Sequence, residues 1–225
     1  MNLWNKISLI FSTILFSGSA FAVGGMKHID VLGYGGYSQA DQWSDAPTKN
    51  YLGTMSGFNG GGMLLVTLSS RILAPVIGAG VDYMQLKSSI KDPTNTFQYS
   101  STLTSMAGTG HLGLRIAGPM VRLFLVGNAG MGLSDKIKTD IALIDQPTSL
   151  SLDSKMKNHV FYGGSAALLV SAGPFVKIGI MGVYNMHTTD LDQTLTDVST
   201  NVSATGSTST SYQEVSGNLV IDINL

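Results

Sequence analysis

Apolar and polar residues alternate along most of this chain with a period of two. Residues 119–132, for example, place Val121 and Leu123 on one face and Arg122 and Asn128 on the other. This alternation predicts β-strands, because successive side chains of a strand point to opposite faces of a sheet. We predict eight strands, over residues 28–37, 54–68, 75–87, 101–116, 119–132, 157–170, 174–187 and 212–225.

The predicted connections alternate between short and long. Three short ones share similar sequences (RILAPVIG, RIAGPMVR and VSAGPFVK), and each leads into a proline. We expect these prolines, Pro75, Pro119 and Pro174, at the first strand position, where proline costs no ladder hydrogen bond. The other connections are long and polar, over 38–53, 88–100, 133–156 and 188–211. Short turns at one rim and long loops at the other are typical of an up-and-down barrel.

The amino-acid composition favours a membrane barrel over a soluble one. Only 12% of the residues are charged, against about a quarter in soluble domains. Many predicted strands reach the roughly 9–11 residues that a tilted membrane strand needs. A soluble barrel would turn its charges outward, whereas a membrane barrel turns its aliphatic face to lipid. We therefore predict an all-β fold, an eight-stranded antiparallel up-and-down transmembrane barrel, with a soluble lipocalin-like barrel as the alternative.

Charge and candidate chemistry exclude several other classes of function. The net charge of −1 offers no basic stripe for nucleic acid, and the absence of cysteine removes disulfides and thiolate metal sites. The four histidines lie far apart in sequence and show no metal-ligand spacing. Asp82, His111 and Ser165 share the inward parity, but no nucleophile-elbow motif accompanies them. We expect no metal, no cofactor and no enzymatic activity.

The first 22 residues have the pattern of a secretory signal peptide. Lys6 provides the positive start, residues 7–16 are apolar, and the segment ends in Ala20-Phe21-Ala22. Small residues at Ala20 and Ala22 are what a signal peptidase requires, so we predict cleavage before Val23. The predicted mature chain, 23–225, is one barrel domain of an exported protein.

The chain also resembles a known group of proteins. The matching features are the cleavage site, the glycine-laced strands (GYGGY at 33–37, GNAGMG at 127–132) and the alternating end NLVIDINL. Together they resemble the small eight-stranded outer-membrane barrels of Gram-negative bacteria, of the OmpA-transmembrane-domain and OmpX type. The resemblance implies a place in the outer membrane, among its lipid and lipopolysaccharide. It also implies that the barrel-assembly machinery reads the last strand, which here closes on Leu225 in place of the usual aromatic residue.

Strand parity places five charged side chains inside the barrel, near the short-turn rim: Asp30, Arg115, Arg122, Lys177 and Asp222. The first and last strands meet when the barrel closes, so Asp30 and Asp222 share a wall opposite the two arginines. Because an isolated ion is disfavoured in a narrow cavity, we predict an ion-pair cluster that plugs the periplasmic half. The cluster is structural in one interpretation and a gate in the other.

These features favour a structural or surface-interaction role, with the polar loop 188–211 as the segment that contacts an extracellular partner. This loop is either mobile or extends its hairpin above the membrane as edge strands. A narrow channel for small solutes is the alternative, although side chains usually fill an eight-stranded barrel. A lipid-modifying enzyme is the third interpretation.

Overall fold

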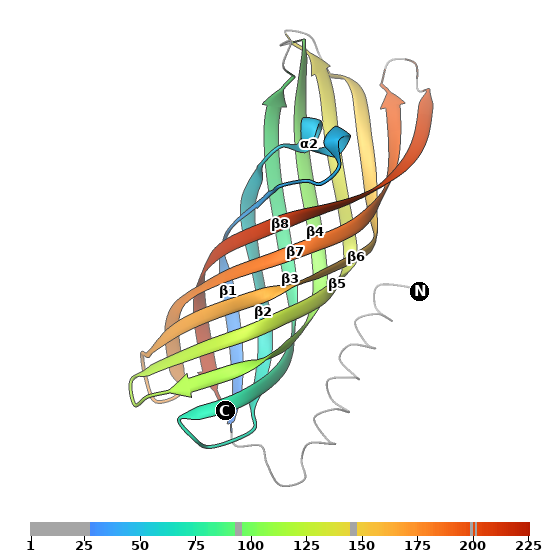
Figure 1. Cartoon of the computed structure of the whole chain (residues 1–225). Coiled ribbons are helices and arrows are strands. Elements are labelled where there is room, and N and C mark those ends of the chain that lie inside the picture. Colours follow the sequence, from blue (N-terminus) through green and yellow to red (C-terminus); the bar gives the residue numbers. More distant parts are fainter. Residues whose placement is uncertain (1–27, 93–95, 145–147, 199, 201) are drawn as a thin grey trace.

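The chain forms a closed barrel of eight antiparallel strands, in which each strand pairs with its sequence neighbours and the last strand pairs with the first (Figure 1). This computed structural model describes residues 28–92, 96–144, 148–198, 200 and 202–225. The strands are β1 (His28–Asp41), β2 (Met55–Thr67), β3 (Leu73–Lys91), β4 (Phe97–Ala117), β5 (Val121–Leu143), β6 (Thr148–Ser171), β7 (Val176–Asp197) and β8 (Ser203–Asn224).

The predicted eight strands and the predicted topology are confirmed. The predicted leader 1–22, with its cleavage site at Ala20, Ala22 and Val23, lies outside the described residues. No helix in the described part of the chain is long and apolar enough to cross a membrane.

The outer wall of the barrel carries a band of exposed aliphatic and aromatic side chains. Leu219 is 73% exposed, Leu112 67% and Ile180 61%, whereas their sequence neighbours on the other face point into the lumen. An apolar outer band around a partly polar interior is the arrangement of a membrane barrel, not of a soluble one. The band includes, among others, Val31, Val81, Leu114, Leu125, Leu168, Ile178, Ile221 and Ile223.

The three prolines lie at the short connections but not at first strand positions. Pro75 is the third residue of β3, and its carbonyl accepts a hydrogen bond from Leu68 N at 3.0 Å. Pro119 and Pro174 lie in the turns, two residues before β5 and β7. The prediction of position was wrong because a proline can enter a ladder through its carbonyl, or can precede it altogether.

The strands continue far beyond the apolar band at the opposite rim, where long loops were predicted. β5 and β6 cover nearly all of 133–156, and β7 and β8 cover nearly all of 188–211. The long-loop prediction was wrong for 133–156, whereas for 188–211 the structure has the extended hairpin that was the alternative to a mobile loop (Figure 1). The extension is polar because neither of its faces contacts lipid, and a polar composition is also typical of a loop. Threonine-rich sequence suits such strands.

The first long connection, 38–53, also differs from the polar surface loop that was predicted. β1 continues to Asp41, and a short helix, α2 (Ala46–Leu52), follows it. Asp45 caps the helix by accepting hydrogen bonds from Thr48 N at 3.0 Å and Thr48 Oγ1 at 2.7 Å. The helix ends at Gly53, whose φ of 55° suits glycine.

Candidate functional site: the closed lumen

The lumen is filled over much of its length by two groups of apolar side chains. The group nearer the short turns, the lower apolar layer, contains Leu32, Met63, Leu65, Val76, Phe124, Val126, Ala167, Leu169, Met181 and Val220. The group nearer the strand extension, the upper apolar layer, contains Ala40, Trp43, Leu52, Met55, Met84, Leu86, Leu103, Ile137, Met156, Leu191 and Tyr212. Apolar side chains that fill the bore of a small barrel close it to water.

The five charged residues predicted for the lumen are all buried there, beside the lower apolar layer. Arg122 Nη1 forms ion pairs with Asp30 and, at 3.2 Å, with Asp222 Oδ2. The two carboxylates come from β1 and β8, and the arginine comes from β5 across the lumen. Asn224 Nδ2 donates a further hydrogen bond to Asp30 at 2.8 Å. The guanidinium thus bridges two fully buried aspartates.

Arg115 and Lys177 lie in the same region without joining that bridge. Arg115 Nη1 donates a hydrogen bond to Thr67 Oγ1 at 3.0 Å. Lys177 lies directly across the β7–β8 ladder from Asp222. The structure therefore brings Arg122 and the two aspartates into direct contact and places the other two cations around them.

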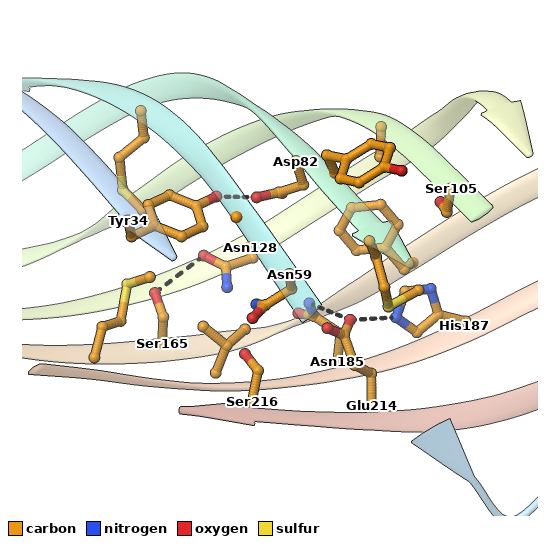
Figure 2. Close-up of a pocket in the computed structure, with 18 of the residues that line it drawn as sticks. Tyr34, Asn59, Asp82, Ser105, Asn128, Ser165, Asn185, His187, Glu214 and Ser216 are labelled. Carbon is orange, nitrogen blue, oxygen red and sulfur yellow. Dashed lines mark hydrogen bonds and ion pairs between the residues drawn. The ribbon is translucent and has the colours of Figure 1, made fainter. Parts of the chain in front are cut away.

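A cavity of about 50 Å³, lined by both polar and apolar side chains, lies above the lower apolar layer (Figure 2). Its volume suits a few water molecules, since one water needs about 10–15 Å³. Asp82, His111 and Ser165 all line it, as their shared parity predicted, but each bonds elsewhere. Tyr34 donates to Asp82. His111 contacts Thr109 and Asn128, each at 3.0 Å, and Ser165 donates to Asn128 at 3.4 Å.

None of the hydrogen bonds among the described residues joins Asp82, His111 and Ser165 to one another. A nucleophile needs a base within hydrogen-bond reach. These three residues therefore share the inner face of the barrel but do not have the contacts of a catalytic triad. No group of described residues has the geometry of a metal site either.

Four ionisable side chains form a hydrogen-bonded chain across the upper lumen, which we call the carboxylate–histidine chain. Glu214 Oε2 lies 3.0 Å from His187 Nε2, and His187 Nδ1 lies 2.9 Å from His159 Nε2. His159 Nδ1 in turn lies 2.9 Å from Asp135 Oδ2. Figure 2 shows the first of these contacts at the edge of the cavity. All four side chains are buried.

The carboxylate–histidine chain reaches the barrel wall where the strand register is irregular. β5 and β6 pair at Met131 with Val160, and their next pair is Lys136 with Lys155. β6 also carries a register shift toward β7 between Lys157 and Val160. A pocket occupies the interrupted β5–β6 ladder and is lined by residues 132–135 and 156–159.

Gly132 makes room for this arrangement. A Cβ at this position would lie 1.6 Å from Asp135 Oδ2 and 2.7 Å from His159 Nδ1. The Asp135–His159 contact therefore packs directly over the Gly132 backbone, and a larger residue there would displace it.

The helix α2 and its flanking residues close the upper end. Trp43 Nε1 donates to Gly53 O at 2.8 Å, and the Trp43 ring lies 4.5 Å from the Tyr212 ring. Gln193 Nε2 donates to Tyr51 OH at 2.6 Å. Burial raises the pKa of the Tyr51 phenol, which lies beyond the apolar band. These contacts hold the first connection inside the barrel mouth.

Hydrogen bonds outside the apolar band also brace the interrupted wall. Asp190 on β7 accepts hydrogen bonds from Ser209 Oγ at 2.6 Å and Asn158 Nδ2 at 2.8 Å. Both hydrogen bonds lower the pKa of the Asp190 carboxyl, because they stabilise its charged form. Asn158, at the β6 irregularity, has a φ of 48°.

Sequence reasoning missed the carboxylate–histidine chain. A usable signal existed for half of it, because His187 and Glu214 lie on the polar faces of predicted strands and Glu214 is the only glutamate. Asp135 and His159 were placed in a long loop and at a strand start, where parity gave no reason to join them.

Comparisons with known proteins agree with this architecture. No family model and no curated protein matches the sequence. Among solved structures, a major outer membrane protein from Thermus thermophilus superposes with a TM-score of 0.51 at 9% identity, over 86% of this chain and 99% of that one. The fold is that of the small outer-membrane barrels.

Two further structures match less closely in shape. The outer membrane protease OmpT from Escherichia coli has a TM-score of 0.46 at 10% identity, over 91% of this chain and 100% of that one. Ail, the attachment invasion locus protein of Yersinia pestis, has a TM-score of 0.40 at 12% identity, over 90% and 100%. At these values the similarity concerns the fold and says nothing about activity.

Proposed function

We propose that this protein is an integral outer-membrane barrel with a closed lumen, which presents its long strand extension at the cell surface in a structural or interaction role. The observation that carries the proposal is the filling of the bore: the Arg122 cluster and the lower apolar layer occupy one end, and the upper apolar layer with α2 occupies the other. Membrane insertion through the apolar band then leaves the extension as the accessible part.

Conductance of the refolded protein in a planar bilayer tests this proposal. We expect no channel steps from protein whose folding is verified by a heat-shift gel. A variant that lacks residues 44–52 and carries Arg122→Ala, Phe124→Ala and Leu169→Ala removes closing groups from both ends, and we expect it to conduct if it folds. Stable channel steps from the wild-type barrel would contradict the closed lumen and support the narrow-channel alternative.

The position of four exposed lysines supports contact with lipopolysaccharide. Lys136 and Lys155 face each other across the β5–β6 ladder, close beyond the exposed Met131 and Val160 of the apolar band. Lys138 is exposed beside them and pairs with Asp140 at 3.4 Å, and the fourth lysine is Lys157. In the described chain, Lys136 and Lys155 form no ion pair. Like charges directly opposite destabilise a sheet, and a lipid phosphate between them would relieve the repulsion.

Binding to lipopolysaccharide micelles tests this contact. We expect the double variant Lys136→Ala/Lys155→Ala to bind several-fold more weakly than wild type at low salt. The matched control is Lys87→Ala/Lys91→Ala, which removes two exposed lysines from β3. Equal weakening in both variants would indicate a general effect of charge and would contradict a specific patch.

The last strand is the proposed contact with the barrel-assembly machinery. Leu219, Ile221 and Ile223 alternate on its outer face, and Leu225 N donates to Ile29 O at 2.9 Å. Because such barrels usually end in an aromatic residue, we expect Leu225→Phe to increase the yield of assembled barrel in cells. The conservative control is Leu225→Ile, and equal yields from both would argue against recognition of the last side chain.

A further inference from the structure

The carboxylate–histidine chain contains more hydrogen bonds than ordinary protonation states can fill. Its three links, Glu214–His187, His187–His159 and His159–Asp135, each need one proton. Two ionised carboxylates supply none, and two neutral imidazoles supply one each. If both imidazole protons point at the carboxylates, two lone pairs face each other at 2.9 Å between the rings. The geometry therefore requires a third proton.

The contact between the two histidines fits a proton and not a metal ion. The nitrogens are 2.9 Å apart and the ring centroids 5.2 Å apart. Adding the centroid-to-nitrogen distance of each ring to the nitrogen–nitrogen distance gives the separation of the two centroids. The two nitrogens therefore point directly at each other. A metal ion on that line would need about 2.0–2.1 Å to each nitrogen, hence a gap of about 4 Å.

The surroundings place the positive charge on the histidines. Glu214 Oε1 accepts a hydrogen bond from Ser38 Oγ at 2.5 Å, which favours the ionised carboxylate. Asp135 Oδ1 likewise accepts from Ser105 Oγ at 2.6 Å and from Met106 N at 3.1 Å. With both carboxylates ionised, the third proton belongs to the imidazole pair.

Two aromatic rings face the same histidine. The Tyr212 ring lies 4.4 Å from the His187 ring at an angle of 6°, and the Phe161 ring lies at 4.9 Å and 26°. A cation within about 6 Å of an aromatic face is attracted to it. Burial by itself disfavours a charged imidazole, and the two carboxylates and two rings oppose that penalty.

We propose that His159 and His187 form a proton-binding site, in which one additional proton is shared between the two imidazoles at neutral pH and ties β6 to β7 beside the interrupted β5–β6 ladder. Loss of the proton leaves two lone pairs opposed and removes one link between β6 and β7, where their register shifts and the neighbouring β5–β6 ladder is interrupted. The proposal concerns proton binding and the stability of the wall, and it holds whether or not the barrel conducts.

Other ionisable groups face this part of the lumen and bear on the pH dependence. They come from β1, β3, β4 and β8, and are Tyr34, Asp82, His111 and Tyr212. Asp82 is held by Tyr34, and His111 contacts Thr109 and Asn128. Lys157, next to the site on β6, is exposed and pairs with Asp192 at 2.5 Å. His111 is therefore the matched control, because it is a buried histidine of the lumen that does not belong to the carboxylate–histidine chain.

Nitrogen NMR of the folded protein, labelled at histidine and held in detergent micelles, counts the protons directly. At pH 7 we expect three of the four ring nitrogens of His159 and His187 to be protonated, with a scalar coupling across the shared hydrogen bond. His111 should show one protonated nitrogen. Two neutral imidazoles in the pair at pH 7 would overturn the proposal, and this measurement on wild-type protein does not depend on any variant folding.

The pH dependence of urea unfolding in lipid vesicles provides a second test. Above the ordinary histidine pKa of about 6.5 the unfolded chain does not hold this proton, whereas the native pair does. Stability should therefore fall as the pH rises, with the unfolding constant increasing about tenfold per pH unit until the native pair releases its proton. We expect His159→Gln to lose this slope and His111→Gln to retain it. The same slope in wild type and His159→Gln would contradict the proposal.

Discussion

Two buried polar clusters lie in the same lumen, one on regularly paired strands and the other on strands whose pairing is irregular. The lower cluster joins Arg122 to Asp30 and Asp222 through strands whose pairing runs without a break near these residues. The carboxylate–histidine chain lies where the β5–β6 ladder is interrupted and where β4–β5 and β6–β7 shift register. Regular strands thus hold one cluster, and irregular strands hold the other.

The two clusters also differ in the kind of charge they carry. A guanidinium stays charged at any pH that the folded protein meets, so the lower cluster has one protonation state of its cation. Imidazoles exchange protons near neutral pH, so the upper cluster responds to its surroundings. The cation that bridges the lower cluster is therefore fixed, whereas the proposed upper link depends on a shared proton.

The largest expected effect is that of Arg122→Ala. The substitution leaves Asp30 and Asp222 buried together without their cation, and breaking a buried ion pair in this way costs about 3–5 kcal/mol. Urea unfolding in vesicles measures the loss, and planar-bilayer conductance shows whether the lower plug has also opened. Arg71→Ala, in the exposed β2–β3 turn, is the control. If the free energy of unfolding falls by no more than about 1 kcal/mol, the range of an exposed ion pair, and conductance is unchanged, then the Arg122 cluster contributes no more than a surface ion pair does.

A smaller effect is expected from Gly132→Ala, which acts on the upper cluster alone. The added methyl group must displace Asp135 or His159, and overpacking of this kind costs about 1–3 kcal/mol. The histidine NMR signals should change along with stability. Gly182→Ala and Gly217→Ala are matched controls, because a Cβ at either position meets nothing within 4 Å. If all three substitutions have the same effect, the close approach at Gly132 is not important.

The smallest effect should come from Asp45→Ala at the start of α2. Loss of the cap destabilises the helix by about 1 kcal/mol. Amide hydrogen exchange should become faster in α2 and around the upper apolar layer, while the lower layer stays protected. Asp153→Ala, at an exposed position on β6, serves as the control. Equal acceleration at both ends of the lumen would show that the two ends open together.

The lower cluster was predictable because side-chain parity persists along a regular strand. Val121 and Leu123 face outward, so Arg122 between them must face inward, and the same reasoning applies to Asp222 beside Ile221 and Ile223. Its partners were less predictable. Arg115 contacts Thr67 rather than an aspartate, because contacts across the lumen depend on barrel stagger and side-chain reach.

The upper cluster was unpredictable because irregular pairing reverses parity. Counting from Val121, Asp135 should face outward, yet its side chain is only 3% exposed, since the β4–β5 register shifts between Met106 and Ala107. On β6 the parity also reverses, since both Lys157 and Val160 are exposed.

The sequence by itself determined the number of strands, their order and the face that meets lipid, because each depends on a local period of two and on turn residues. Tertiary structure alone decided the height of the extension, the inward fold of α2 and the meeting of His159 with His187. These features depend on pairing between distant strands, on the interrupted β5–β6 ladder and on the register shifts of β4–β5 and β6–β7, and no local pattern of apolar and polar residues records them.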